Sequence, residues 1–191
     1  STFVFMFILF GAFLLTSGAG DFVIKLARAV AGRFAGGPGL VAVFSSGLTG
    51  TISGSAVANT ASTGVITIPL MKRAGFNPKF AAGVEAAAST GGQLMPPIMG
   101  AGAFVMASYT QIPYTTIVVY SILPAILYFA TVAFFVRVEA KKAGILTVDD
   151  ENLNVFTIIR TEGLPFLIPI ATLISLLIYG FTPTYAAGIS I

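Results

Sequence analysis

The sequence predicts an all-helical integral membrane protein, and three observations carry this prediction: the composition, the distribution of charges, and interruptions within the apolar segments. Apolar residues make up 56% of the 191 residues, against roughly 45–50% in soluble proteins. Charged residues make up 9%, where about 25% is usual. The mean hydropathy is +0.95. So few charges cannot cover a water-exposed surface, and a lipid bilayer is the expected environment.

The residue types that are missing exclude several kinds of chemistry. The chain has no Cys and no His, which excludes disulfides, thiolate chemistry and the commonest transition-metal ligands. Ser53 or Ser55 could act as a nucleophile, but neither has a histidine, a lysine or a pair of acids placed to serve it as a base. We therefore expect neither an enzyme nor an organic cofactor. The net charge of +3 is thinly spread, so nucleic-acid binding is not expected.

The charges predict how the chain crosses the membrane. The segments without any charge are residues 1–20, 34–71, 86–136 and 163–191. Basic residues lie only between these segments, so the positive-inside rule places the basic loops in the cytoplasm. We expect residues 1–19 to be a truncated transmembrane helix of a longer polypeptide. Residues 20–34 have Asp21, Lys25 and Arg28 on one side, which predicts an amphipathic helix at the membrane surface.

Residues 35–72 are predicted to form a re-entrant helical hairpin that enters and leaves on the cytoplasmic side. As one helix, the uncharged stretch would be about 57 Å long, although the hydrocarbon core is only ~30 Å thick. One crossing would place Lys72 and Arg73 outside, and two full crossings need more residues. The turn is expected at Ser53-Gly54-Ser55. The expected arms cover residues 38–51 and 57–71.

The second half of the chain is predicted to cross the membrane three more times. Residues 79–108 form a broken transmembrane helix, because Gly91-Gly92 followed by Pro96-Pro97 cannot continue a regular helix; a plain proline kink is the alternative. The later segments are a transmembrane helix at 114–136, a cytoplasmic loop at 137–162 and a transmembrane helix at 163–181. The loop holds the acidic run Asp149-Asp150-Glu151, which we interpret as solvated. The last helix heads outward and would start a repeat of opposite orientation.

The hairpin turn and the helix break are the candidate sites. Oxygen-bearing side chains are dense around the turn: Thr49, Thr51, Ser53, Ser55, Asn59, Thr60, Ser62 and Thr63. Such oxygens and the carbonyls of a broken helix suit a hard monovalent cation, whereas close packing of small residues is the alternative. Glu85 is the only acid well inside a predicted span, so it is a functional candidate, or else an anchor at the interface. The scarcity of buried acids favours sodium over a proton as coupling ion.

Two stretches carry a family resemblance. GLTGTISGSAVANTASTGVITIPLMKRAGF, followed by AAASTGGQLMPPIMGAGAF, resembles the large membrane subunit of TRAP transporters (tripartite ATP-independent periplasmic transporters). The similarity is closest to the fused permeases served by TAXI-type solute-binding proteins. The resemblance implies an elevator-type, ion-transporter-superfamily-like fold of two inverted repeats, each with a re-entrant hairpin and a discontinuous helix. This sequence would hold one repeat and the start of the second.

The resemblance also implies particular site residues. The family's hairpin-turn motif falls on Ser53, Gly54 and Ser55, followed by Asn59 and Thr60. Its broken-helix motif falls on Thr90, Gly91, Gly92, Gln93 and Pro96. We expect the sodium ion at Ser53, Gly54, Ser55, Asn59, Thr90, Gly91 and Gly92. We expect the substrate at Thr60, Thr63, Gln93 and Pro96.

The function that follows from this resemblance is secondary active import, a sodium-coupled uptake of a small organic acid across the bacterial inner membrane. The expected partners are a periplasmic TAXI-type binding protein, a small TRAP membrane subunit that is separate or fused, the organic acid and the lipid bilayer. No transition metal is expected. The alternatives are a structural membrane anchor of a larger complex without an ion site of its own, and a passive channel.

Overall fold

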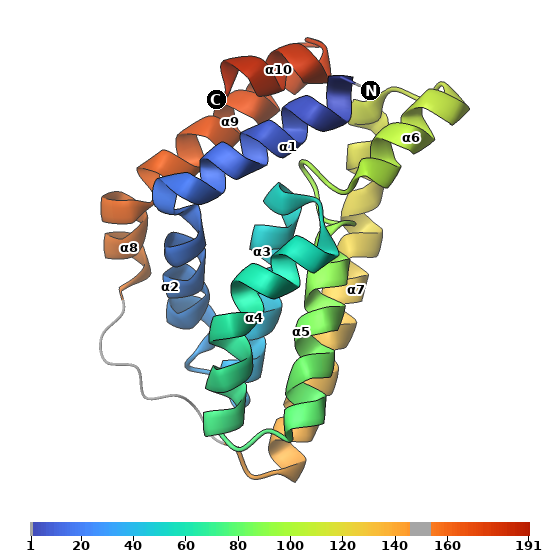
Figure 1. Ribbon diagram of the computed structural model, residues 1–191. Coiled ribbons are helices and arrows are strands. Elements are labelled where there is room, and N and C mark those ends of the chain that lie inside the picture. Colours follow the sequence, from blue (N-terminus) through green and yellow to red (C-terminus); the bar gives the residue numbers. More distant parts are fainter. Residues whose placement is uncertain (1, 146–153) are drawn as a thin grey trace.

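The described chain is built of helices that pack in two groups (Figure 1). The computed structural model describes residues 2–145 and 154–191. Helices α3, α4, α5 and α7 lie side by side, and α1 passes across one end of this group together with α9 and α10 (Figure 1). The helices are α1 (Thr2–Leu14), α2 (Gly20–Ala31), α3 (Gly37–Ser53), α4 (Ala56–Arg73), α5 (Pro78–Gly92), α6 (Ala101–Thr110), α7 (Tyr114–Lys142), α8 (Val155–Glu162), α9 (Leu164–Ile178) and α10 (Pro183–Ile189).

Apolar length and outward-facing apolar surface agree with the predicted membrane environment. Within the described residues, two helical stretches are long and apolar enough to cross a bilayer: Phe5–Ala31, with 27 residues, and Tyr114–Lys142, with 29. Helices α8 and α9 would make a third span if counted together, with a bend of 78° between them. The most apolar part of α7 is only 11% buried inside the protein. An apolar surface of that extent requires lipid or a partner protein to cover it.

Helices α3 and α4 form an antiparallel pair around a short turn at Gly54 and Ser55 (Figure 1). The turn lies where the sequence predicts the hairpin to reverse, because a glycine can take the left-handed backbone that ends α3. Helix α4 ends in basic residues, whose positive charge is stabilised by the negative end of the helix dipole. The re-entrant position of this hairpin relative to a bilayer stays a prediction.

The predicted span at residues 79–108 consists of two helices separated by residues 93–100. Helix α5 begins after Asn77, whose side chain accepts a hydrogen bond from the backbone N–H of Lys79 at 2.9 Å. It ends at Gly92, ahead of Pro96 and Pro97, which have no N–H to continue a helix. Helix α6 begins only at Ala101. The chain is therefore discontinuous where the glycine and proline pairs indicate it.

The segment 137–162, predicted to be a cytoplasmic loop, is helical at both ends, and this corrects the prediction. Helix α7 continues to Lys142, and Val155–Glu162 form α8. The reason is tertiary: Ile158 of α8 is buried in the core it shares with α1 and α2. Lys25 of α2 also forms an ion pair with Glu162 of α8 at 2.7 Å. The acidic run at 149–151 lies outside the described residues.

Helix α2 follows α1 after a π-helical turn, Leu15–Ala19, with which it forms one bent element. Its apolar face is divided between two environments. Phe22 and Val23 are buried in the protein, whereas Val30 is 43% exposed, and Phe34, which follows the end of the helix, is 52% exposed. The packed part of this face contacts α3, so α2 covers one side of the hairpin. Its predicted place at the membrane surface stays a prediction.

Candidate functional site

The hairpin turn is fixed by local backbone geometry. Gly54 has φ +59°, and its N–H donates to the carbonyl oxygen of Gly50 at 3.1 Å. The next helix is capped at once, because the hydroxyl of Ser55 accepts from the backbone N–H of Ala58 at 3.3 Å. A side chain at position 54 would have its Cβ 2.8 Å from the carbonyl oxygen of Met99, in the helix break. The turn and the break are therefore in direct contact.

A second contact between the hairpin and α5 depends on two glycines. A Cβ built on Gly50 would lie 2.6 Å from the Cα of Gly92, and one built on Gly92 would lie 2.5 Å from the Cα of Gly50. The same Cβ on Gly50 would lie 2.9 Å from Nδ2 of Asn59. The structure thus brings together Gly50 of α3, Asn59 of α4 and Gly92 of α5. The sequence predicts Asn59 and Gly92 at one site, and the structure adds Gly50 to them.

Two buried side-chain oxygens on the hairpin arms have no hydrogen-bond partner among the described residues: Asn59 Oδ1 and Thr49 Oγ1. Asn59 is 0% exposed, and its Nδ2 donates to the backbone oxygen of Ser46 at 2.6 Å, which turns the Oδ1 atom away from that bond. Buried polar atoms normally find a partner. Amide and hydroxyl oxygens are ligands of hard cations such as sodium. These oxygens therefore fit a cation, and they could equally accept from water.

The helix break between α5 and α6 is held from both sides. Its ends are joined because the N–H of Gly100 donates to the carbonyl oxygen of Gln93 at 2.8 Å. The side chain of Gln93 reaches the hairpin, where Nε2 donates to the carbonyl oxygen of Gly54 at 3.4 Å. On the other side, the hydroxyl of Tyr114 lies 2.6 Å from the carbonyl oxygen of Ile98 and 2.9 Å from that of Pro97. The break is thus a defined loop and not a kink within one helix.

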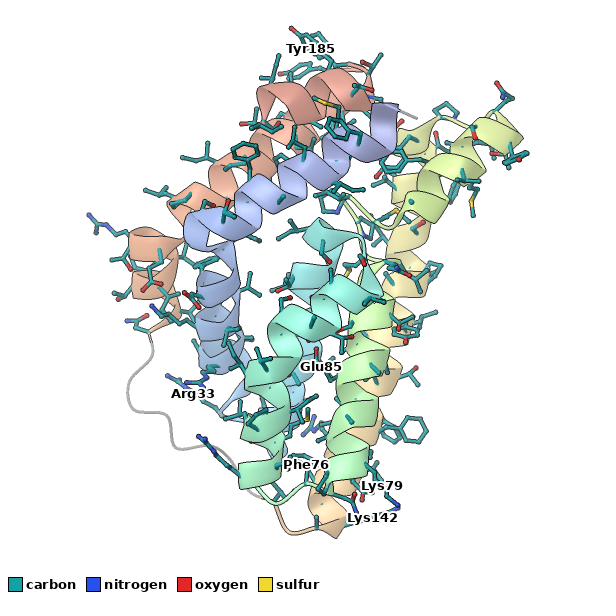
Figure 2. The ribbon with its side chains drawn as sticks, viewed as in Figure 1. Arg33, Phe76, Lys79, Glu85, Lys142 and Tyr185 are labelled. Atoms are coloured by element: carbon teal, nitrogen blue, oxygen red, sulfur yellow. The ribbon has the colours of Figure 1, made fainter. Side chains whose placement is uncertain are left out.

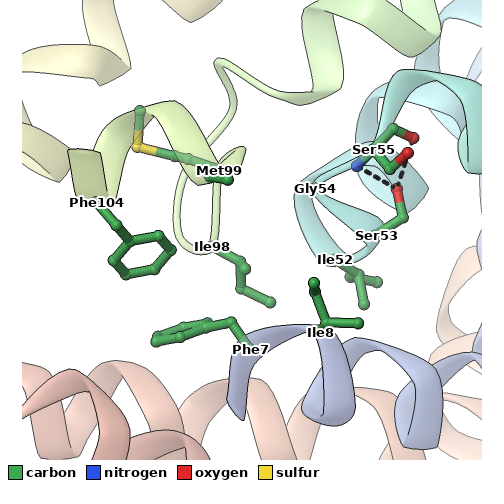
Figure 3. A pocket seen from close by; sticks show the side chains of 10 residues that line it. Phe7, Ile8, Ile52, Ser53, Gly54, Ser55, Ile98, Met99 and Phe104 are labelled. Atoms are coloured by element: carbon green, nitrogen blue, oxygen red, sulfur yellow. Dashed lines mark hydrogen bonds between the residues drawn. The ribbon is translucent and has the colours of Figure 1, made fainter. Parts of the chain in front are cut away.

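A cavity of about 210 Å³ opens where α1 meets the hairpin turn and the break. Its polar wall is the turn itself, and its apolar wall comes from α1 and from the segment after the break (Figure 3). The residues that line it are Phe7, Ile8, Ile52, Ser53, Gly54, Ser55, Ile98, Met99, Ala101 and Phe104. Water occupies about 30 Å³ per molecule, so this space suits several waters or part of a small solute. A carboxylate would find its polar contacts on the hairpin side.

A third polar site lies between the hairpin arms and α5, centred on Glu85. This residue is 0% exposed, and Figure 2 shows it about midway along the helices, far from Lys79 and Lys142 at their end. Its Oε1 accepts from Ser46 at 2.8 Å, and its Oε2 accepts from Thr67 at 2.5 Å. Oε1 also accepts from Thr63 and from Ser89. The interpretation of Glu85 as an anchor at the membrane interface is therefore wrong, because neighbouring helices enclose it.

The other predicted site residues lie in different places. Thr63 contacts Glu85 and not the hairpin turn. The hydroxyl of Thr90 is exposed and donates to the carbonyl oxygen of Ala86 in its own helix. Thr60 and Pro96 are half-buried, near the start of α4 and within the break respectively. Gly91 packs against the ring of Tyr128, where a Cβ would overlap the ring.

The sequence points to Glu85 as a candidate, and it also carries a periodic signal for the hydroxyls that surround it. Asn59, Thr63 and Thr67 recur every four residues, which puts them on one face of α4. Glu85 and Ser89 have the same spacing on α5. Two polar stripes on neighbouring apolar helices are expected to face each other, because lipid offers them no hydrogen bonds.

The fold and the site define a class of protein. An apolar exterior, a helical hairpin whose turn meets an interrupted helix, and buried oxygens at that meeting point are typical of multi-pass membrane transporters. The whole chain, residues 1–191, matches the family described as tripartite ATP-independent periplasmic transporter, DctM component. The chain belongs to this family of permeases, which are transporters and not enzymes.

Several curated proteins are similar to the chain. It is 30% identical to the protein YgiK of Salmonella typhimurium over 97% of its own length and 42% of that protein. It is 36% identical to the C4-dicarboxylate TRAP transporter large permease protein DctM of Pseudomonas aeruginosa, over 56% of the chain and 25% of that protein. It is 26% identical to the sialic acid TRAP transporter large permease protein SiaM of Vibrio cholerae, over 96% of the chain and 43% of that protein. The chain thus spans less than half the length of these relatives.

Proposed function

We propose that the chain is the hairpin-bearing part of a secondary active importer, which couples the uptake of a small organic acid to sodium across the bacterial inner membrane. The observation that carries the proposal is the meeting of the hairpin turn with the helix break. Membership of the DctM family supports the transporter class. The names of two relatives, one for C4-dicarboxylates and one for sialic acid, support a carboxylate substrate.

The proposed sodium ion binds where the two interrupted helices meet. Asn59 Oδ1 is the first proposed ligand, because it is buried and without a partner in the described chain. Backbone oxygens of the turn at Ser53, Gly54 and Ser55, and of the neighbouring Gly91 and Gly92, would complete an all-oxygen shell. Thr49 is a further proposed ligand because its hydroxyl is also buried without a partner. Thr90 stays a proposed ligand, because its hydroxyl donates to the carbonyl oxygen of Ala86 and keeps oxygen lone pairs for a cation.

The proposed substrate is an anion, although basic side chains are missing from the middle of the hairpin and of α5. Its carboxylate would be bound by hydroxyls and by backbone N–H groups at helix starts, where the helix dipole favours negative charge. Gln93 and the serines of the turn are the proposed contacts, since they border the break and the cavity beside it. A periplasmic binding protein of the TAXI type would deliver the substrate, and a small membrane subunit would complete the transporter. An elevator movement of the hairpin with the broken helix would carry the substrate across.

The test uses the full-length transporter, reconstituted with its binding protein in proteoliposomes. Uptake of a C4-dicarboxylate and of a sialic acid is measured under an inward sodium gradient, and then without it. We expect saturable uptake that needs both sodium and the binding protein, and we expect Asn59→Ala to raise the sodium concentration for half-maximal uptake by about tenfold, the effect of losing ~1.4 kcal/mol of binding.

The matched control is Asn77→Ala. Asn77 is an exposed asparagine that caps α5 at the opposite end from the break. This variant should keep the sodium response of the wild type. Equal sodium activation in Asn59→Ala and in the wild type would overturn the ion site. Uptake that does not saturate, or that ignores the binding protein, would indicate a channel, and no uptake with intact assembly would favour a structural anchor.

A further inference from the structure

The Glu85 site differs from the proposed sodium site in that each carboxylate oxygen has a hydrogen-bond donor. The four hydroxyls come from three helices: Ser46 from α3, Thr63 and Thr67 from α4, and Ser89 from α5 itself. Glu85 thereby joins both arms of the hairpin to the helix that carries the break. A buried ionisable group inside a membrane protein is costly and marks function more often than structure.

No cation neutralises this carboxyl within the part of the chain that the structure describes. Helices α3, α4 and α7 pack against α5. Helix α3 has no titratable side chain, and α4 has only Lys72 and Arg73, which are exposed in its last turn. Helix α5 has Lys79 in its exposed first turn. The charged groups of α7 are Arg137, Glu139, Lys141 and Lys142, all near its C-terminal end, and its tyrosines are Tyr114, Tyr120 and Tyr128. None of these groups is hydrogen-bonded to Glu85; the Tyr128 hydroxyl donates to the backbone of Ala87 instead.

The geometry also argues against a metal ion between these oxygens. Ions of about the size of Ca²⁺ keep oxygen ligands at about 2.3–2.6 Å, so neighbouring ligands are generally about 3 Å or more apart. Thr67 Oγ1 lies 2.5 Å from Glu85 Oε2, and Thr63 Oγ1 lies at the same distance from Oε1. These separations are those of short hydrogen bonds to a carboxyl group. The hydrogen between such atoms belongs to the hydroxyl when the carboxyl is charged, and can belong to the carboxyl when it is neutral.

The hydroxyls can serve the carboxyl group in both of its protonation states. The Thr67 hydroxyl lies 3.0 Å from the carbonyl oxygen of Thr63, and the Thr63 hydroxyl lies 2.8 Å from that of Asn59. Each threonine can therefore donate to Glu85 when the carboxyl is charged. When the carboxyl carries a proton, it can donate to a threonine oxygen, and the threonine then donates to its own helix. Rotation of a hydroxyl is enough to change between the two arrangements.

We propose that Glu85 is a reversible proton-binding site that couples protonation to the packing of the hairpin against α5. The carboxyl takes a proton from water when the helices separate, and gives it back to water when they separate again; no other reactant is needed. Packing encloses the group, and an unneutralised carboxylate is costly to enclose. Proton occupancy and helix packing are therefore linked. A role for this proton in the transport cycle rests on the proposed function. The binding of a proton by Glu85 does not depend on that function.

The test is infrared difference spectroscopy of the purified full-length transporter in lipid, titrated from about pH 4 to about pH 9, which covers the range in which buried carboxyl groups titrate. We expect the carbonyl-stretch band of a neutral, buried carboxylic acid to disappear as the pH rises. Glu85→Gln should abolish the band, because its amide imitates the neutral form but cannot titrate. The control Glu139→Gln changes a half-buried acid near the end of α7 and should leave the band in place.

A second variant keeps the carboxyl and alters only its surroundings. Ser89→Ala removes one donor to Oε1, so the carbonyl-stretch band of Glu85 should shift in frequency relative to the wild type. A band that persists in Glu85→Gln, or a band frequency that Ser89→Ala does not move, would overturn the proton site. The measurement needs neither sodium nor substrate. A loss of sodium-driven uptake would thus overturn the proposed function alone, and a missing Glu85 band would overturn the proton site alone.

Discussion

The two polar regions of the hairpin differ in how their oxygens are satisfied. Around Glu85, hydroxyls from three helices donate to one carboxyl group, and the hydrogen bonds close within the protein. On the hairpin arms, Asn59 Oδ1 and Thr49 Oγ1 are buried without a partner in the described chain, and at the turn Ser53 and Ser55 border a cavity. One region has its hydrogen bonds made by the fold, and the other leaves oxygens available to a ligand.

This difference assigns different roles to chemically similar residues on the same two helices. Removing a hydroxyl whose bond is made should cost stability, because its buried partner loses a donor. Removing a hydroxyl without a partner should cost little stability and should affect what binds there. Ser46 connects the regions: its backbone oxygen accepts from Asn59, and its hydroxyl donates to Glu85. The proposed ion binding and the proposed protonation of Glu85 would therefore be linked through this residue.

The largest expected effect comes from the glycine contact that holds both regions against α5. Gly92→Ala would place a Cβ 2.5 Å from the backbone of Gly50, and backbone atoms cannot move aside as a flexible side chain can. We expect a loss of about 1–3 kcal/mol of stability, measured as the shift in thermal unfolding of the full-length transporter. Gly83→Ala in the same helix meets nothing within 4 Å. It should stabilise by up to about 1 kcal/mol through helix propensity, and equal effects in the two variants would contradict the close contact.

The next effect tests the satisfied region. Thr67→Val keeps the shape of the side chain and removes the hydroxyl that donates to Glu85 Oε2. We expect a loss of about 1–3 kcal/mol, the cost of leaving a buried acceptor without its donor. Thr131→Val is the matched control, since the Thr131 hydroxyl is exposed and bonds only the carbonyl oxygen of Leu127 in its own helix. If both substitutions cost the same, the Glu85 cluster adds nothing to the packing of the hairpin.

Thr49→Val makes the same chemical change in the unsatisfied region. The Thr49 hydroxyl has no partner in the described chain, so the unfolding temperature should stay within the range of the control, or rise. The sodium concentration for half-maximal uptake should instead rise severalfold. A large loss of stability with unchanged sodium dependence would reverse the assignment of the two regions.

The sequence predicts where helices form and where they break, but it does not predict which helices contact each other. The hairpin turn and the break at residues 93–100 follow from local causes: a glycine in left-handed backbone, and prolines without an N–H. The approach of Gly50 to Gly92 depends on how α3 crosses α5, which no local pattern specifies. Thr63 is one of the residues expected at the substrate. The period of α4 turns it toward Glu85 instead.

The burial of Glu85 and the helical structure of α8 also depend on contacts between helices, which no local sequence pattern specifies. The sequence leaves Glu85 as either a functional residue or an anchor at the interface, because its burial is produced by α3 and α4 packing over it. Residues 155–162 belong to the predicted loop because they lie in the charged stretch between two uncharged segments. The charge of Glu162 is paired with Lys25 on α2, and that partner is 137 residues away in the sequence.

The smallest expected effect lies outside both polar regions, at this ion pair. Lys25 and Glu162 meet at 2.7 Å, but their side chains are 48% and 39% exposed. Exposed pairs contribute about 0–1 kcal/mol and are screened by salt. Lys25→Met should therefore change the unfolding temperature slightly, and the change should vanish at high salt. A double-mutant cycle with Glu162→Gln measures the pair itself. A coupling as large as the loss expected for Thr67→Val would show that the α2–α8 contact stabilises the hairpin as strongly as the Glu85 cluster does.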